Sequence, residues 1–430
     1  MGKKVYLESI GCRLNQSEIV TMTRQFQQVG YRIVQDAAEA DLFVVNTCAV
    51  TGDAGKDSRK LVRSLHRQNK NAEITVTGCY AHVAPETVRA LPGVRYVLDN
   101  FDKEQLVPMV TGESFDLEPL QRHYTPGTAG LTRAFVKVQD GCDNTCTFCI
   151  TTIARGKGRS RPLEAVVREV QMMAAGGYQE IVLTGVHLGS YGHDFGNQNG
   201  LRDLVKALLE ATDIPRIRLS SLEPWDLSDD FFQLWENPRL CRHLHLPLQS
   251  GCDATLKRMR RNTKQQAFRK LVESARAQIP GLGLSTDLIV GFPGEDEDEF
   301  AESFAFTEAM NFMKIHVFPY SRREGTPAAR MKGHVDKVMA KNRLRQIQEL
   351  SDDGGRRFAQ QYIGQTLPVL WEQIRGASEE GFWHAGLTDN YIRVELKYPD
   401  NLTNTIILTR LIALSENSVT GELSEKRSQM

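Results

Sequence analysis

Along the first 111 residues, short apolar runs alternate with longer segments in which apolar residues recur at helical spacing. Helical spacing is typical of amphipathic helices, and short apolar runs bounded by polar residues are typical of buried strands. We predict strands at 4–10, 42–45, 74–76 and 95–98, and helices at 18–29, 57–68 and 85–91. Alternating strands and helices indicate an open parallel α/β sheet.

From Ala134 onward, a strand followed by a helix recurs six times. The predicted strands are 134–139, 180–186, 216–220, 243–248, 284–290 and 314–319. The predicted helices between them are 163–175, 201–211, 228–236, 265–278 and 296–310. Six such units predict a partial, TIM-like (β/α)6 barrel, whose functional residues are expected at the carboxyl ends of the strands.

The pattern changes again near the carboxyl terminus. A helix is predicted at 335–357, followed by short β-like runs at 367–371, 381–384, 391–396 and 405–411, which indicate a small antiparallel β-barrel. Residues 112–133 contain Gly and Pro without a sustained period, which is typical of a linker. We therefore divide the chain into 1–111, 112–133, 134–360 and 361–430.

Charge and composition narrow the functional classes. The 430 residues hold equal numbers of basic and acidic side chains, so any contact with nucleic acid must come from local patches. No apolar run approaches the roughly 20 residues needed to span a bilayer, and the chain opens directly into a strand pattern without a signal peptide. We expect a cytoplasmic protein whose eight cysteines are reduced and available to metals.

Three of those cysteines, Cys142, Cys146 and Cys149, lie in one short loop with the spacing C-x3-C-x2-C. We call them the loop cysteines. Thiolates select soft metals, and a closed zinc site would need a fourth Cys or His, whereas the nearest histidines in the sequence are His123 and His187. An iron–sulfur cluster on three cysteines keeps one iron open, so the loop is interpreted as catalytic. A zinc or redox cluster is the alternative.

With Phe148 as the aromatic residue of C-x3-C-x-Φ-C, this loop resembles the signature of the radical S-adenosylmethionine (SAM) enzymes. The resemblance implies a [4Fe-4S] cluster whose free iron binds SAM and cleaves it to methionine and a 5′-deoxyadenosyl radical. It also implies that strand-end segments contact SAM, with Glu295 equally explained as a carboxylate at a helix start. The predicted cofactor-binding residues are Phe148, Thr184, Gly185, Ser220, Glu223, Gln249, Gly291 and Glu295.

A second group of cysteines follows predicted strands of the first domain: Cys12, Cys48 and Cys79. We call them the strand-end cysteines. The carboxyl ends of parallel strands meet at one edge of a sheet, so these three can share a crevice although they lie far apart in the sequence. The alternative is that each is simply a small buried residue.

The segments 11–18, 46–51 and 77–80 around them resemble the amino-terminal domain of the radical SAM methylthiotransferases. Within that family, the segments 11–16, 46–51 and 183–192 look most like the branch that modifies N6-threonylcarbamoyladenosine at position 37 of tRNA. The resemblance implies a second [4Fe-4S] cluster on the strand-end cysteines, which carries the sulfur to be transferred. It implies methylthio transfer to C2 of the adenine with two SAM molecules, and no catalytic side chain beyond the six cysteines. Implied partners are the tRNA anticodon loop and a low-potential electron donor such as flavodoxin or ferredoxin.

RNA contacts are predicted less directly. A basic run next to the loop cysteines is the first candidate: Arg155, Lys157, Arg159 and Arg161. The carboxyl-terminal barrel resembles the TRAM domain, an RNA-binding module, yet residues 361–430 hold more acidic than basic side chains. Three alternatives stay open: the same chemistry on isopentenyladenosine or on an aspartate of a ribosomal protein, another radical SAM reaction, and a non-enzymatic zinc and RNA-binding protein.

Overall fold

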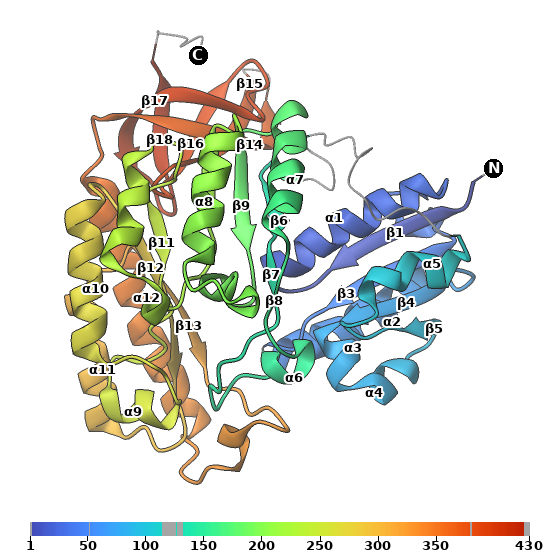
Figure 1. Ribbon diagram of the computed structural model, residues 1–430, viewed down its shortest axis with the longest axis horizontal. Coiled ribbons are helices and arrows are strands. Elements are labelled where there is room, and N and C mark those ends of the chain that lie inside the picture. The colour runs from blue at the N-terminus through green and yellow to red at the C-terminus, as the bar shows by residue number, and fades with distance from the viewer. Residues whose placement is uncertain (1, 51, 114–125, 127–131, 379–380, 425–430) are drawn as a thin grey trace.

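The computed structural model describes residues 2–50, 52–113, 126, 132–378 and 381–424 (Figure 1). Its amino-terminal domain is a five-stranded parallel sheet with the order β2-β1-β3-β4-β5. The strands are β1 (Lys4–Ser9), β2 (Arg32–Ile33), β3 (Leu42–Thr47), β4 (Glu73–Gly78) and β5 (Val94–Val97). The helices are α1 (Arg13–Gln28), α2 (Gly52–Gln68), α3 (Cys79–Val83), α4 (Pro85–Arg89) and α5 (Leu106–Thr111), with a 3-10 turn η1 (Ala37–Glu39). The predicted open parallel sheet is confirmed.

Alternation along β3 explains why this sheet is covered on both faces. Leu42 and Val44 pack with residues of α1 and α5, whereas Phe43 and Val45 pack with residues of α2. Every residue of β3 is buried, as expected for a central parallel strand.

The first helix differs from its prediction. The sequence predicts a helix from Glu18, but α1 begins at Arg13. The predicted start is too late because the first turns of α1 carry polar residues that are nevertheless buried, Asn15 and Glu18 among them. Burial of polar groups that find partners within the protein does not follow the apolar period on which the prediction relied. The strand β2 and the helix α5 were not predicted.

The central domain contains two three-stranded parallel sheets, β10-β9-β6 and β11-β12-β13, joined by single bridges such as Ser221 to His245. The strands are β6 (Ala134–Lys137), β9 (Glu180–Thr184), β10 (Arg216–Leu219), β11 (His243–His245), β12 (Gly283–Val290) and β13 (Lys314–Pro319). Its helices include α7 (Leu163–Ala175), α8 (Gly200–Ala211), α9 (Asp253–Arg258), α10 (Gln265–Gln278), α11 (Glu297–Ala309) and α12 (Lys337–Gln360). Six parallel strands in sequential order confirm the partial barrel.

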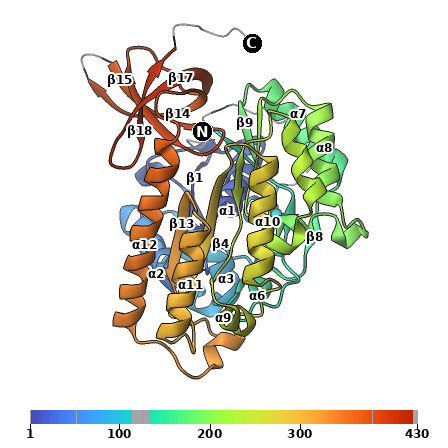
Figure 2. The same ribbon diagram turned by 90° about the vertical axis from the view of Figure 1, so that its left-hand side faces the viewer.

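One apolar core fills this domain, and α10, α11 and α12 lie side by side along its outer face (Figure 2). The segment predicted as a helix at 228–236 is a 3-10 helix, η7 (Asp229–Glu236). A small hairpin of β7 (Gln139–Asp140) and β8 (Arg159–Ser160) flanks the short helix α6 (Thr151–Arg155). This hairpin and α6 frame the loop cysteines.

The carboxyl-terminal barrel is closed in the order β14-β15-β16-β18-β17 around the buried Trp371. Its strands are β14 (Thr366–Ser378), β15 (Gly381–Thr388), β16 (Arg393–Tyr398), β17 (Thr405–Leu414) and β18 (Val419–Leu423). All its pairings are antiparallel except that of β16 with β18, which is parallel and which closes the barrel. The predicted small β-barrel is confirmed, although β18 was not predicted.

The barrel docks where the central strands begin (Figure 1). Arg218 of β10 donates to the backbone oxygens of Thr388 and Asp389, and the Asp389 carboxylate accepts from Arg242. Part of the acidic excess of the barrel is thus used to hold it in place. Beyond Asp389, the Tyr391 hydroxyl lies 2.7 Å from a guanidinium nitrogen of Arg13, which follows Cys12 in the sequence.

Most of the predicted linker 112–133 lies outside the described residues. Among the described residues, none of the helices combines the length and the apolar character needed to cross a membrane.

Candidate active site

The loop cysteines lie between β7 and α6, beyond the carboxyl end of β6. Backbone hydrogen bonds fix the loop, from Cys142 N to Gly156 O at 3.0 Å and from Thr147 N to Met259 O at 3.0 Å. Gly141 has φ +75°, and a Cβ placed there would stand 1.9 Å from the backbone oxygen of Lys157. The chain therefore turns into the loop at a position where only glycine fits.

Two cationic groups lie beside the loop cysteines. A guanidinium nitrogen of Arg261 lies 3.6 Å from Cys146 Sγ, and Arg261 is itself paired with Glu223. Burial raises the pKa of Cys146, and the charge of Arg261 opposes that shift. His187 hydrogen-bonds to the Asp226 carboxylate at 2.6 Å, and it lies beside the Cys142 thiol. Burial alone lowers the pKa of His187, but these two partners outweigh it and raise the pKa to about 10.

His187 was not assigned a role from the sequence, because it is distant from Cys142 along the chain. No signal in the sequence brings the two together, since their approach depends on the pairing of β6 with β9. The other histidine considered as a fourth ligand, His123, lies outside the described residues.

The strand-end cysteines converge as predicted from the topology. Cys12 precedes α1, Cys48 follows β3, and Cys79 opens α3 directly after β4. A Cβ on Gly11 would stand 2.7 Å from Cys48 Sγ, which places the first two loops in contact. Burial raises the pKa of Cys48 to about 11, and the neighbouring thiols Cys12 and Cys79 add to the increase. Three thiols from three strands thus share one crevice.

The donor set distinguishes a cluster from a single metal ion. Within the described residues, no three Cys, His, Asp or Glu side chains are arranged to hold one ion. Zinc draws its ligand atoms to 2.0–2.3 Å from one centre, whereas the thiolates of an iron–sulfur cluster bind separate irons and stand farther apart. Two groups of three thiols supply the three protein ligands of a cluster that keeps one iron open.

The two groups of cysteines face each other across a domain interface. Cys79 of the amino-terminal domain packs in one apolar cluster with Ile150 and Ala154 of the central domain. The amide nitrogen of Asn100 bonds both to Cys79 Sγ, at 3.6 Å, and to the backbone oxygen of Ala154, at 2.8 Å. The helix α6 is therefore the shared wall between the loop cysteines and the strand-end cysteines.

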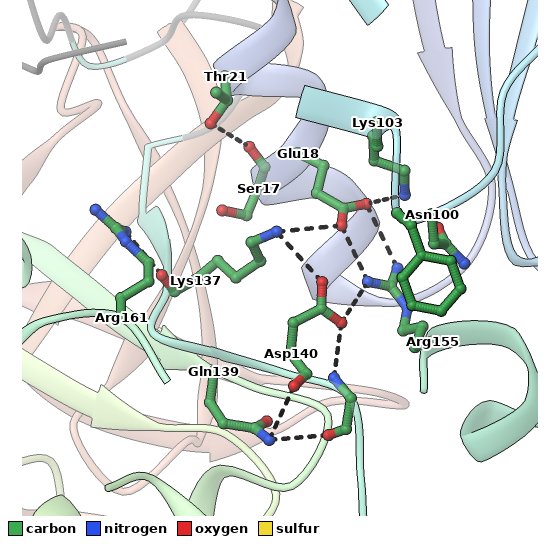
Figure 3. Close-up of polar contacts among 12 residues, drawn as sticks. Ser17, Glu18, Thr21, Asn100, Lys103, Lys137, Gln139, Asp140, Arg155 and Arg161 are labelled. Carbon is green, nitrogen blue, oxygen red and sulfur yellow. Dashed lines mark hydrogen bonds and ion pairs between the residues drawn. The ribbon is translucent and has the colours of Figure 1, made fainter. Parts of the chain in front are cut away.

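Charged side chains from both domains meet behind this wall (Figure 3). Arg155, the last residue of α6, pairs with Glu18 at 3.0 Å and with Asp140 at 2.9 Å. Glu18 also pairs with Lys103 at 2.6 Å and with Lys137 at 3.6 Å. The cations hold the pKa of the Glu18 and Asp140 carboxyls below their usual values despite burial. The network thus joins the two domains through ionised groups.

Apart from Phe148, which lies in the cysteine loop, the residues predicted to contact SAM lie at or after the carboxyl ends of β9, β10, β11 and β12. Phe148 packs edge-on against Phe292 with ring centroids 6.4 Å apart. The Thr184 hydroxyl donates to the backbone oxygen of Val136 at 3.1 Å, so this hydroxyl is already used within the fold. Ser220 and Tyr320 each carry a buried hydroxyl with no hydrogen-bond partner in the described structure. Unsatisfied buried hydroxyls are expected where a polar ligand binds.

Gln249 and Glu295, which were also predicted to contact SAM, stabilise the backbone around them. Gln249 adopts φ +70°, and its backbone exchanges hydrogen bonds with Asp287 and Ile289 of β12. The Glu295 carboxylate accepts from Gly291 N and from Arg343 at 2.8 Å, and it is almost completely buried. This carboxylate therefore closes the turn after β12. The first turn of α11 is capped by the next residue, Asp296.

The four residues of the predicted RNA patch separate into two groups. Arg155 is 2% exposed and engaged in the network above, so its side chain does not reach the surface and cannot contact RNA in this arrangement. Arg161 is partly buried and pairs with Glu169 at 2.6 Å. Lys157 and Arg159 remain exposed. Arg159 lines a cavity of about 510 Å³ between the two domains, together with Lys103, Lys137 and Asp140.

Two family models match the chain. One is described as uncharacterized protein family UPF0004 and covers residues 4–99, and the other is the Radical SAM superfamily and covers residues 136–307. The first contains all strand-end cysteines, and the second contains all loop cysteines.

Curated relatives align over nearly the whole chain. The threonylcarbamoyladenosine tRNA methylthiotransferase MtaB of Bacillus subtilis (strain 168) is 36% identical over 95% of this chain and 93% of that protein. The protein of the same name from Thermotoga maritima is 36% identical over 97% of this chain and 96% of its own length. A tRNA-2-methylthio-N(6)-dimethylallyladenosine synthase of Geobacillus kaustophilus is 32% identical over 98% of this chain and 82% of that protein.

Solved structures show the same fold at low identity. The radical SAM methyltransferase TsrM from Kitasatospora setae, with cobalamin and a [4Fe-4S] cluster bound, superposes with a TM-score of 0.57 at 15% identity, covering 76% of this chain and 77% of that one. The cobalamin-dependent SAM radical enzyme OxsB gives 0.52 at 12% identity, covering 82% and 56%. At these identities the likeness concerns the fold alone.

Proposed function

Because the chain belongs to the radical SAM tRNA methylthiotransferase family, we propose that it adds a methylthio group to C2 of N6-threonylcarbamoyladenosine at position 37 of tRNA. Two relatives named for threonylcarbamoyladenosine support this substrate, since they are 36% identical and align over 93% and 96% of their own lengths. The relative named for dimethylallyladenosine is 32% identical and aligns over 82% of its length.

The proposal assigns one cluster to each of the first two domains. Residues 1–111 hold an auxiliary [4Fe-4S] cluster on the strand-end cysteines, residues 134–360 hold the SAM-cleaving [4Fe-4S] cluster on the loop cysteines, and residues 361–430 are the TRAM-like domain. The observation that carries the proposal is that two groups of three thiols, from two domains, lie on either side of α6. A reaction that joins a sulfur from one centre to a carbon activated by the other needs this proximity.

When bound, the two clusters would supply the reacting species, each at the expense of one SAM: a 5′-deoxyadenosyl radical that removes the C2 hydrogen, and a methylated sulfur that replaces it. The side chains of this protein prepare the site. Arg261, paired with Glu223, lies beside Cys146. His187, paired with Asp226, lies beside Cys142. The hydroxyl of Ser220 is available to a polar cofactor. The remaining predicted SAM contacts are Phe148, Thr184, Gly185, Gln249, Gly291 and Glu295.

The partners follow from the same proposal. The target base must leave the stack of the anticodon loop to reach a centre buried between domains. Lys157 and Arg159 are the exposed cations nearest the loop cysteines in sequence, and they are proposed to contact the RNA backbone. A low-potential electron donor such as flavodoxin or ferredoxin is needed for reductive cleavage. A tRNA substrate supports a cytoplasmic location.

Mass spectrometry of nucleosides from tRNA tests the proposal. Cells that lack the gene are expected to lose 2-methylthio-N6-threonylcarbamoyladenosine and to accumulate the form without the methylthio group, and a plasmid copy is expected to restore the modification. Loss of the 2-methylthio derivative of isopentenyladenosine instead would assign the second substrate. Unchanged tRNA nucleosides together with an unmodified ribosomal-protein aspartate would assign the third.

A further inference from the structure

Every nitrogen of the Arg155 guanidinium donates a hydrogen bond close to the strand-end cysteines. Its Nε donates to Cys79 Sγ at 3.3 Å. One terminal nitrogen donates to Glu18 and Asp140, and the other donates to Asn15 Oδ1 at 2.9 Å. The thiol of Cys12 in turn donates to the same Asn15 oxygen at 3.7 Å. One planar group therefore contacts one strand-end cysteine directly and a second through a single amide.

The same residue is tied to the other cysteine group by its position in the chain. α6 follows Cys149 closely, and the backbone N–H of Thr151, the first residue of the helix, lies 3.4 Å from Cys149 Sγ. Asp140, the partner of Arg155, accepts from the backbone N–H of Gly141 at the root of the cysteine loop. Arg155 is thus linked to the loop cysteines through the backbone and to the strand-end cysteines through its guanidinium.

The network joins three cations, Lys103, Lys137 and Arg155, to two carboxylates, Glu18 and Asp140 (Figure 3). Lys137 is 23% exposed, so water screens its charge, whereas Arg155 is almost fully buried. The Arg155 Nε faces the Cys79 thiol directly, so its buried positive charge would stabilise a metal-bound thiolate there.

We propose that Arg155 is a positioning residue of the auxiliary centre: it holds Cys79 toward the loop cysteines, and its hydrogen bond and charge raise the reduction potential of a cluster bound there. The proposal rests on the proposed function, because it assumes a cluster on the strand-end cysteines. Hydrogen bonds to the ligating sulfurs and a nearby positive charge stabilise the reduced, more negative state of an iron–sulfur cluster. Asn100, the other donor to Cys79, contributes through a neutral amide and therefore acts more weakly.

The auxiliary centre can be isolated in the full-length chain by replacing the loop cysteines with alanine. In that background we compare Arg155→Lys and Arg155→Gln with the unaltered Arg155, after anaerobic reconstitution with iron and sulfide. Arg218→Lys is the matched control, because Arg218 is a fully buried arginine of the same domain that pairs with Glu180 and contacts the barrel. The readouts are iron per chain, circular dichroism and the midpoint of a redox titration followed by electron paramagnetic resonance.

Arg155→Gln is expected to lower the equilibrium constant for one-electron reduction at least tenfold, which is about 59 mV toward more negative potential. Arg155→Lys, which keeps the charge but loses the directed N–H, is expected to give a smaller shift of the same sign, and Arg218→Lys none. Loss of auxiliary iron from the Arg155 variants with unchanged circular dichroism also supports a positioning role. An unchanged midpoint with full iron, or unfolding of the whole chain by both variants, overturns the proposal.

These outcomes are independent of the RNA substrate. A shifted midpoint in a protein whose gene deletion leaves tRNA unchanged would retain Arg155 as a positioning residue and reject the proposed function. Normal tRNA modification with an unshifted midpoint would reject only the role of Arg155.

Discussion

The two groups of cysteines place three thiols each around a candidate centre, but they are built in opposite ways. The loop cysteines lie within one short segment and owe their arrangement to a single loop between β7 and α6. The strand-end cysteines come from three loops, so their arrangement depends on the register of β1, β3 and β4 in the sheet. The first group is fixed by local backbone geometry, and the second is fixed by the packing of a whole domain. A change that harms one group need not harm the other.

Replacing single cysteines should separate the two groups most strongly. Cys142→Ala is expected to abolish both SAM cleavage and methylthio transfer, whereas Cys79→Ala is expected to abolish methylthio transfer and to retain SAM cleavage, because only the loop cysteines act on that SAM. Each variant should lose about four irons per chain. Iron analysis, chromatographic detection of 5′-deoxyadenosine and nucleoside mass spectrometry provide the three readouts. Retention of SAM cleavage in Cys142→Ala would contradict the assignment.

A pair of glycine variants tests the two modes of construction without touching a thiol. A Cβ on Gly141 would stand 1.9 Å from Lys157 O, and one on Gly78, with φ +98°, would stand 2.3 Å from Thr47 O. Gly141→Ala is expected to reduce the iron held by the loop cysteines, and Gly78→Ala that held by the strand-end cysteines. Gly177→Ala is the control, since its φ of +89° carries only the backbone strain of about 1–3 kcal/mol and its Cβ would have open space.

If each clashing variant lowers both iron populations equally, the two groups are not built independently. Spectra of the remaining iron in each glycine variant, compared with the spectra of Cys142→Ala and Cys79→Ala, distinguish these outcomes.

Glu18→Gln probes the contact between the domains. The substitution leaves Lys103 and Arg155 without their shared carboxylate in a buried place, which typically costs about 3–5 kcal/mol. We expect a lower midpoint temperature in thermal unfolding. We also expect the strand-end cysteines to lose more iron than the loop cysteines. Glu73→Gln, which removes an exposed partner of Arg95, should leave both nearly unchanged. Equal loss of iron from both groups would show that the network supports the whole chain rather than one centre.

A pH experiment on Glu180 of β9, where the central domain meets the carboxyl-terminal barrel, should have the smallest effect on the cysteines. Burial alone raises the pKa of Glu180, but Arg218 and its neighbours lower it overall to about 2. Because the folded pKa lies below the ordinary value of 4.5, the carboxylate stabilises the fold above pH 4.5, and this contribution of about 3 kcal/mol is lost as the pH falls toward 2. Urea unfolding of cluster-free protein at pH 7 and pH 3 measures the loss, and Glu180→Gln should show a weaker pH dependence.

The sequence predicted the features that depend on short range or on a repeated pattern. The spacing of the loop cysteines, the six strands of the partial barrel and the strand ends that carry Cys12, Cys48 and Cys79 were all predicted. Features that depend on partners distant in the chain were missed. Arg155 was interpreted as an RNA contact because it belongs to a basic run, yet its partners Glu18 and Asn15 come from another domain. The approach of His187 to Cys142 was missed for the same reason.

The hydrogen bond between Tyr391 and Arg13 has a consequence for the order in which the molecule is made. Arg13 and Tyr391 are separated by 378 residues in the sequence, yet the two meet beside Cys12. A nascent chain on the ribosome therefore holds all six cysteines long before the surroundings of the first one are complete. Iron delivered before the barrel has folded and docked would therefore meet an incomplete site at Cys12.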